Sequence, residues 1–320
     1  MLKRGIVSLG QLEAAGPASK KLISAALLLE LEGALDDHRA SLRERVIRGL
    51  LLPNTTGKTT WSRRFDQIDT EIANIARERF REGLSCLDLG VSDGTTAVEL
   101  FRKLEDIDGL IYTMTDMNGR IFIRCGRFFT DVCDDDGSLV QFGVGPFVIP
   151  VTRLSHIHPF QLVNRLLFVL AWSRRERVRE DWKKDSNDGD SNSSWKSVSL
   201  LAPEAQSLVA NEPRVDFRRL NLFSPPRGQY QLVRMMNVLN LKRADFGFSH
   251  EEAAEGLRSV LGLVGDGGLL LVGRTSRPTD GDPVTRATLV EKTNSGLRAI
   301  WRIEGGSELE QFMEIEVEKA

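Results

Sequence analysis

The sequence predicts an α/β fold with a mostly parallel sheet that ends in an antiparallel hairpin. The run SCLDLG (85–90) is short and almost continuously apolar, as expected of a strand buried on both faces of a parallel sheet. A segment with helical periodicity and a second apolar run, GLIYTMTD (109–116), follow it. Strand, glycine-containing turn, helix and strand make a βαβ unit. Near the C-terminus, two alternating segments flank Asn294-Ser295-Gly296, which is typical of a hairpin.

The region before the first strand is predicted to be helical. Residues 19 to about 50 place apolar side chains on one helical face. A second amphipathic segment, 65–83, ends at a glycine. We therefore expect a helical N-terminal cover over 1–83 and a second domain over 84–320.

A large insertion interrupts the second domain at about 119–212. Segments 120–132 and 138–151 alternate like strands around an acidic turn, which predicts a hairpin. A strong helix is predicted over 158–180. The polar run that follows, 181–196, has little apolar content and is predicted to be a mobile loop.

Regular elements return after the insertion. Segments 214–223 and 229–241 have strand-like composition, and 267–274 reads as another buried strand. Between the last two, Ser249 and Glu252 have the spacing of a capping box, which predicts that a helix begins there.

Composition narrows the possible functions. The 320 residues carry a formal net charge of −2, so no overall positive field favours nucleic acid. Three cysteines are too few for a disulfide framework. No segment reaches the roughly 18 uninterrupted apolar residues of a membrane span, and the start of the chain lacks a signal-peptide apolar core. The sequence predicts a cytoplasmic protein.

The turn after the first strand carries the clearest chemical signal. Gly90 and Gly94 allow the backbone to bend sharply and to approach a ligand closely, with Ser92 between them. A pyrophosphate would be repelled by the acids Asp88 and Asp93. An amino-acid headgroup fits better, because its carboxylate matches the turn amides and its ammonium matches an acid. This segment predicts a site for a methionine-like group.

A second acid accompanies the turn. Asp116 ends the second strand, 26 positions beyond Gly90, where it could accept hydrogen bonds from both hydroxyls of a ribose. NAD sites also use an acid at this place, so Asp116 indicates an adenosine ribose without choosing the cofactor.

Together these features resemble the class I S-adenosylmethionine-dependent methyltransferases, over roughly residues 84–305. The resemblance implies a Rossmann-like fold, S-adenosylmethionine as the cofactor and methyl transfer as the reaction. The segments VDFRRLNLFSPP, QLVRMMNVLNL and GDGGLLLVG are also similar to the chemotaxis-receptor glutamate methyltransferases. That similarity implies that Asn221 and Leu222 border the adenine. It also implies that Asn237, with the Val238 and Leu239 that follow, forms a wall beneath the methionine part.

The C-terminal similarity has departures that affect the acceptor. Met235-Met236 replaces the usual Cys-Arg, and Asn240-Leu241 stands where an aromatic pair is common. We therefore carry over the cofactor and the fold but not glutamate as the acceptor. A small-molecule acceptor is favoured, and a protein carboxylate stays open. The candidate bases, named only for their place on loops, are His156, His158, Asp245 and His250.

Each assignment has a structural alternative. Asp88 could cap the next helix, Asp116 could serve a turn, and Asn221 and Asn237 could satisfy backbone groups. The whole chain could also be a non-catalytic binding protein or, less favourably, a nicotinamide dehydrogenase.

Three further patterns give weaker signals. The segment 53–60 hints at a phosphate loop but lacks its first glycine, because position 52 is leucine. Cysteines and histidines lack the paired spacing of a metal site, so none is predicted. The apolar helix 160–172 is expected to be core or a lid, and its arginine-rich end leaves peripheral membrane contact open.

Overall fold

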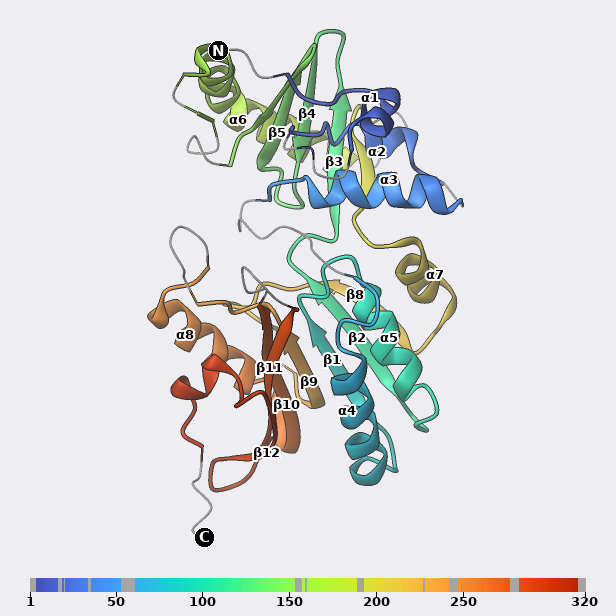
Figure 1. Ribbon diagram of the computed structural model, residues 1–320, viewed down its shortest axis with the longest axis vertical. Helices are drawn as coiled ribbons and strands as arrows, with labels where there is room; N and C mark the ends of the chain where they lie inside the picture. Colours follow the sequence, from blue (N-terminus) through green and yellow to red (C-terminus); the bar gives the residue numbers. More distant parts are fainter. Residues whose placement is uncertain are drawn as a thin grey trace. The chain divides into compact units, whose positions relative to one another are not determined.

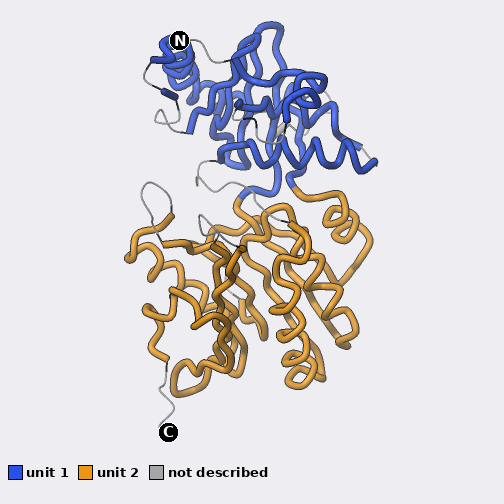
Figure 2. The backbone as a smooth tube through the Cα atoms, viewed as in Figure 1, with its two compact units in different colours: residues 1–59, 118–200 blue, residues 60–117, 201–320 orange. Residues whose placement is uncertain are grey.

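The chain forms two compact units, coloured separately in Figure 2. Unit 1 consists of residues 1–59 and 118–200, and unit 2 of residues 60–117 and 201–320. The computed structural model describes residues 4–16, 19, 21–33, 36–52, 61–152, 157–158, 160–188, 193–226, 228–241, 247–276 and 282–315.

Unit 2 is built on a seven-stranded sheet in the order β12-β11-β10-β9-β1-β2-β8 (Figure 1). Its parallel strands are β1 (Ser85–Leu89), β2 (Ile111–Asp116), β8 (Val215–Arg219), β9 (Tyr230–Met236) and β10 (Val264–Ser276). Two antiparallel strands, β11 (Val284–Lys292) and β12 (Leu297–Ile303), close the sheet. The predicted fold class, Rossmann-like with a terminal hairpin, is confirmed.

Helices cover both faces of this sheet. On one face lie α4 (Asp66–Arg79), α5 (Thr95–Leu104) and α7 (Pro203–Asn211), whose apolar side chains share a core with Cys86 and Tyr112 of the sheet. On the other face, α8 (His250–Leu261) and the short helix η2 (Glu308–Phe312) pack on Leu87 and Val233. Strand side chains alternate between the two faces, so β1 and β9 are buried on both sides, as their apolar runs indicated.

Local sequence signals fix several boundaries in unit 2. The capping box at the start of α8 is present, with the Ser249 hydroxyl accepting from the Glu252 amide and the Glu252 carboxylate accepting in return. Gly94, with a φ of +84°, ends the turn before α5. The hairpin between β11 and β12 turns at 293–296, as predicted.

Unit 1 is built on a five-stranded antiparallel sheet in the order β6-β5-β4-β3-β7. These strands are β3 (Arg120–Cys125), β4 (Phe129–Cys133), β5 (Leu139–Val144), β6 (Phe147–Pro150) and β7 (Lys196–Ser199). The N-terminal helices α1 (Leu9–Ala14), α2 (Leu27–Glu30) and α3 (Asp37–Arg48) share one core with the sheet. The long helix α6 (Leu162–Asp188) shares another with it.

Unit 1 corrects four expectations. The hairpin predicted around the acidic turn is present as β4 and β5. Each predicted strand is two strands, however, because each alternating segment folds back on itself at a glycine-containing turn. The helix predicted over 19 to about 50 is two helices, α2 and α3, with Gly33 at a φ of +73° between them, and Ile23 before them forms a β-bridge with Ile6. The run 181–196, predicted as a loop, instead continues α6 to Asp188 and begins β7 at Lys196. The predicted domain boundaries differ too, because α4 and α7 belong to unit 2.

The extension of α6 has a physical reason. Trp182 packs edge-on against Phe122, with ring centroids 5.3 Å apart, which anchors a stretch that is polar in sequence. Tertiary packing of this kind overrides weak local signals. None of the helices in the described part of the chain combines the length and apolar character needed to cross a bilayer.

Candidate functional site

The candidate site of unit 2 lies where the strand order of the sheet reverses. Numbered in chain order, the five parallel strands run 3-2-1-4-5, so the reversal falls between β1 and β9, which are hydrogen-bonded neighbours. Helices leave β1 and β9 on opposite faces, which separates their ends. Ligands of open α/β sheets bind at this point, outside the carboxyl ends of the strands.

The backbone at the end of β1 makes a tight, left-handed turn. Gly90, Ser92 and Gly94 have φ values of +68°, +62° and +84°. Ser92 is a non-glycine residue in a region that costs such residues free energy. Its amide donates to the Asp116 carboxylate at 2.8 Å, and the Val91 amide donates to the Thr115 carbonyl at 2.9 Å. The structure therefore brings the turn and Asp116 together.

The two glycines are also required by packing inside unit 2. A Cβ atom placed on Gly90 would lie 2.5 Å from a methyl group of Val238, at the end of β9. One placed on Gly94 would lie 2.6 Å from the Cβ of Ala205 in α7. Any side chain at either position would therefore displace its neighbour, so these glycines do not by themselves demonstrate a ligand.

Asp93 lies at the start of α5. Its carboxylate accepts from the Thr95 amide at 3.0 Å, and its carbonyl accepts from the Ala202 amide at 2.7 Å. The residue is largely buried. Asp93 therefore satisfies an amide of the first helical turn, as short acidic side chains commonly do.

Asp88 does not have the role that the sequence indicated. It is 2% exposed, and its carboxylate accepts from Arg234 through Nε at 3.0 Å and Nη2 at 2.5 Å. The Tyr112 hydroxyl donates to the same carboxylate at 2.8 Å. Both oxygens are therefore bound within the protein. We correct the assignment of Asp88 from a cofactor ligand to the buried partner of Arg234.

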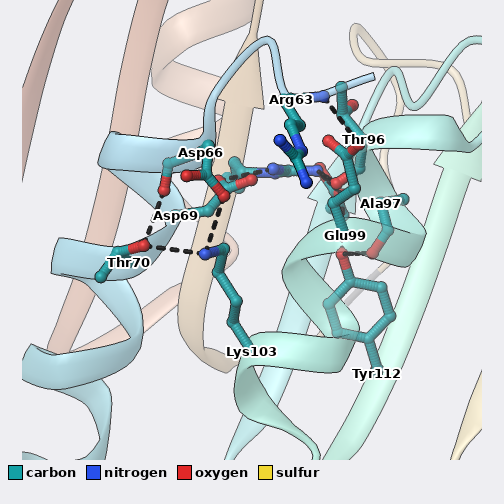
Figure 3. A network of polar contacts seen from close by, with 11 residues as sticks. Arg63, Asp66, Asp69, Thr70, Thr96, Ala97, Glu99, Lys103 and Tyr112 are labelled. Carbon is teal, nitrogen blue, oxygen red and sulfur yellow. Dashed lines mark hydrogen bonds and ion pairs between the residues drawn. The ribbon is translucent and has the colours of Figure 1, made fainter. Parts of the chain in front are cut away.

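Arg234 is the centre of a buried polar network. It is 1% exposed, and besides Asp88 it donates to Asp69 of α4 at 2.8 Å and to the Thr96 carbonyl of α5 at 2.9 Å. Figure 3 shows the labelled members Asp69, Thr96 and Tyr112 close together. Sequence reasoning missed Arg234 and Asp69. The available signal was an arginine inside the apolar strand QLVRMM, since a buried charge requires a partner.

Burial raises the pKa of the Asp69 carboxyl from 3.8 to about 6, although Arg234 opposes the shift. The folded protein thus holds this proton more tightly than the unfolded chain, so the stability that Asp69 contributes is complete below about pH 3.8 and is lost as the pH rises through 6.

We expect the free energy of unfolding of the wild type, measured in urea, to fall on the order of 3 kcal/mol further than that of Asp69→Asn between pH 4 and pH 7. The asparagine variant supplies the matched control, because it keeps the size and lacks the ionisation. Parallel pH profiles for the two proteins would show that Asp69 does not titrate in this range.

The three C-terminal candidate residues, Asn221, Leu222 and Asn237, make hydrogen bonds or packing contacts inside unit 2. Asn221 is exposed, and its side chain accepts from the Phe223 amide at 3.1 Å. Leu222 is buried in the core under α8. Asn237 has a φ of +60°, and its side chain accepts from the Thr275 amide at 2.8 Å, which ties the end of β9 to β10. Contacts of Asn221 and Leu222 with adenine stay a prediction.

Two of the four candidate bases are among the described residues, and they belong to different units. His158 belongs to unit 1 and lies beside Phe160, while His250 is the first residue of α8 in unit 2 and contacts Phe312. His156, Asp245 and the segment 53–60 lie outside the described residues. Within the described ranges, no group of three side chains has the arrangement of a metal site.

Comparisons with known proteins give only partial similarities. No protein-family model matches the chain, and no curated protein sequence does. Among solved structures, the chain is similar to the S-adenosylmethionine-bound amino pentose methyltransferase CalS10 from Micromonospora echinaspora, with 10% identity over 82% of this chain and 72% of CalS10, at a TM-score of 0.30. The carbon methyltransferase CurJ shows 12% identity over 79% of this chain and 49% of CurJ, at a TM-score of 0.36.

A complex of LepI with S-adenosylmethionine shows 11% identity over 78% of this chain and 39% of LepI, at a TM-score of 0.31. The chain spans about half the length of several such proteins, including 52% of the cyclase SpnF. All these TM-scores lie below 0.5, so the description of the fold rests on the strand order and not on these similarities.

Proposed function

We propose that unit 2 is an S-adenosylmethionine-dependent methyltransferase domain that binds its cofactor at the carboxyl ends of β1, β2 and β9. The observation that carries the proposal is the hydrogen bond between the Ser92 amide and Asp116, which joins a strained turn to an acid on the next strand. Ser92 and Asn237, both non-glycine residues with positive φ, lie in the turns that follow the two strands on either side of the reversal. Such conformations concentrate at ligand sites.

The residues present fit this cofactor with one change from the predicted set. The amides of Val91, Ser92 and Gly94 already donate within the protein, so the turn 90–94 would border the methionine end by close backbone approach. Asp116 would hold the ribose hydroxyls. Asp93 is the acid that remains for the ammonium group, because Asp88 is bound to Arg234. Asn221, Leu222 and Asn237 stay in the proposed set as the adenine and methionine borders.

When bound, the cofactor supplies a methyl group that is already activated by its sulfonium charge. The protein's contribution is to align the acceptor with that methyl group and to exclude water. We favour a small-molecule acceptor, since the chain has no excess of positive charge that would suit nucleic acid. The similarity of the C-terminal segments to the chemotaxis-receptor enzymes stays a prediction, and with it a protein carboxylate as the acceptor.

Thermal unfolding with added ligands tests the proposal. A ligand that binds only the folded state raises the apparent melting temperature as its concentration rises. We expect S-adenosylmethionine and S-adenosylhomocysteine to raise it and NAD to leave it unchanged. An increase with NAD alone would indicate a dehydrogenase. An increase with S-adenosylmethionine, but no methylated product from any acceptor, would indicate a binding protein without turnover.

A further inference from the structure

Unit 1 contains a pocket whose lining residues are all different from those of the site proposed in unit 2. It has a volume of about 540 Å³ and lies between the turn that joins β3 to β4 and the C-terminal half of α6. Its charged lining is formed by Arg124, Arg174, Arg177 and Asp181, and its apolar lining includes Phe129 and Val178. We refer to it as the arginine pocket.

The positive charges of the arginine pocket are only partly balanced. Arg124 donates to Asp131 at 3.0 Å and to Asp181 at 3.2 Å, and Arg174 donates to the same Asp131 at 3.3 Å. In the part of the chain that the structure describes, Arg177 makes neither a hydrogen bond nor an ion pair. Three guanidinium groups thus face two carboxylates, which leaves one positive charge for a ligand.

Two of these guanidinium groups are also held rigidly. Arg174 stacks over Phe129 at 4.3 Å, and Arg124 stacks over Trp195 at 4.5 Å. The Nε–H groups of both arginines are buried and have no hydrogen-bond acceptor among the described residues. These Nε–H groups are enclosed by protein, as is the Asp131 Oδ1 that also has no partner among the described residues. The charge available to a bound carboxylate or phosphate is therefore that of the guanidinium groups lining the pocket.

An exposed apolar stripe runs along α6 towards this pocket. Val163, Leu166 and Leu170 are 40%, 69% and 48% exposed. They are spaced by three and four residues, and the same spacing continues to Arg174 and Arg177, so all five side chains project from one side of the helix. One side of α6 therefore presents apolar groups first and cations next.

We propose that unit 1 binds a single-chain amphiphile whose anionic head, a carboxylate or a phosphate, enters the arginine pocket and whose apolar chain lies along Val163, Leu166 and Leu170. The arginines match the charge and the forked geometry of such a head. A single chain suits the size of the site, because one pocket of about 540 Å³ lies at the end of one stripe of three apolar side chains.

The experiment is a calorimetric titration of the full-length protein with dodecanoate and dodecyl phosphate below their micellar concentrations. We expect one saturable site per chain for both probes. Arg177→Gln should weaken binding about tenfold, the loss of one charge-assisted contact. Its matched control is Arg179→Gln, which removes the same charge two positions further on, from the opposite side of the helix, and should bind as the wild type does.

A second pair of variants tests the apolar part. Leu170→Asn should weaken binding of both probes several-fold, whereas Val169→Asn, which alters a neighbour of similar exposure outside the stripe, should not. Unchanged melting temperatures for all four variants would show that each loss concerns the site. The proposal is overturned if neutral dodecanol binds as tightly, if Arg177→Gln equals its control, or if only phosphatidylglycerol vesicles bind.

Discussion

Replacing Arg234 with methionine should lower the free energy of unfolding by about 3 to 5 kcal/mol. Arg234 is fully buried and is the counter-charge of Asp88 and the hydrogen-bond partner of Asp69. Methionine has a similar length and no charge, so it leaves these carboxylates in the core without that partner. Uncompensated buried charge is among the most costly defects a protein can carry.

Urea denaturation followed by tryptophan fluorescence or circular dichroism measures this loss. Arg218→Met is the matched control, because Arg218 is exposed on β8 and its ion pair with Asp216 lies in solvent. That variant should change stability by less than about 1 kcal/mol.

The variant Asp69→Leu, Asp88→Leu, Arg234→Met should regain much of the loss, since it removes all three charges together. A loss below about 1 kcal/mol for Arg234→Met alone would show that the network contributes little.

Asp116→Ala should weaken the binding of S-adenosylmethionine by about 10- to 100-fold, which corresponds to the 1.5–3 kcal/mol of a hydrogen bond to a charged group. The substitution removes the proposed acceptor of the ribose hydroxyls. It also removes the carboxylate that accepts from the Ser92 amide and holds the turn. Both effects act on the cofactor site.

Calorimetric titration measures this effect. Asp216→Ala is the matched control, because it makes the same change on the neighbouring strand β8, where the side chain is exposed, and it should leave the affinity unchanged. Asp116→Asn should fall between the wild type and Asp116→Ala, because its amide oxygen can still accept from Ser92. Equal affinities for Asp116→Ala and the wild type would remove Asp116 from the site.

The parts of the fold that could be predicted have signals contained in a short segment. The turn after β1, the capping box of α8 and the Asn-Ser-Gly turn between β11 and β12 each depend on a few adjacent residues. The apolar runs of β1, β2 and β10 are also signals contained in short segments, and together they predict a parallel sheet.

Unit 1 could not be predicted in the same way, because contacts distant in sequence hold it together. The side chain of Gln141 in β5 accepts from the Ala25 amide at 2.7 Å and donates to the Ile23 carbonyl at 3.0 Å. These partners are more than 110 positions apart in the sequence. No local periodicity reveals that the N-terminal segment packs on the sheet of the insertion. The sequence therefore predicts a separate helical cover where the structure has one unit.

The candidate site shows the same division between local and distant information. The bend at 90–94 and its proximity to Asp116 follow from the βαβ pattern itself. The role of Asp88 does not, because its partner Arg234 lies 146 positions away. The sequence predicts that Asp88 binds the ammonium group of the cofactor. In the structure, the guanidinium group of Arg234 already binds both carboxylate oxygens of Asp88.

The crystal structure of the protein grown with S-adenosylhomocysteine is the most direct test of the proposed cofactor site. We expect the ligand's amino-acid end against the backbone of Gly90 and Ser92, and its sugar oxygens within hydrogen-bonding distance of the Asp116 carboxylate. Density for the ligand at any other place on unit 2, or none at saturating concentration, would contradict the assignment.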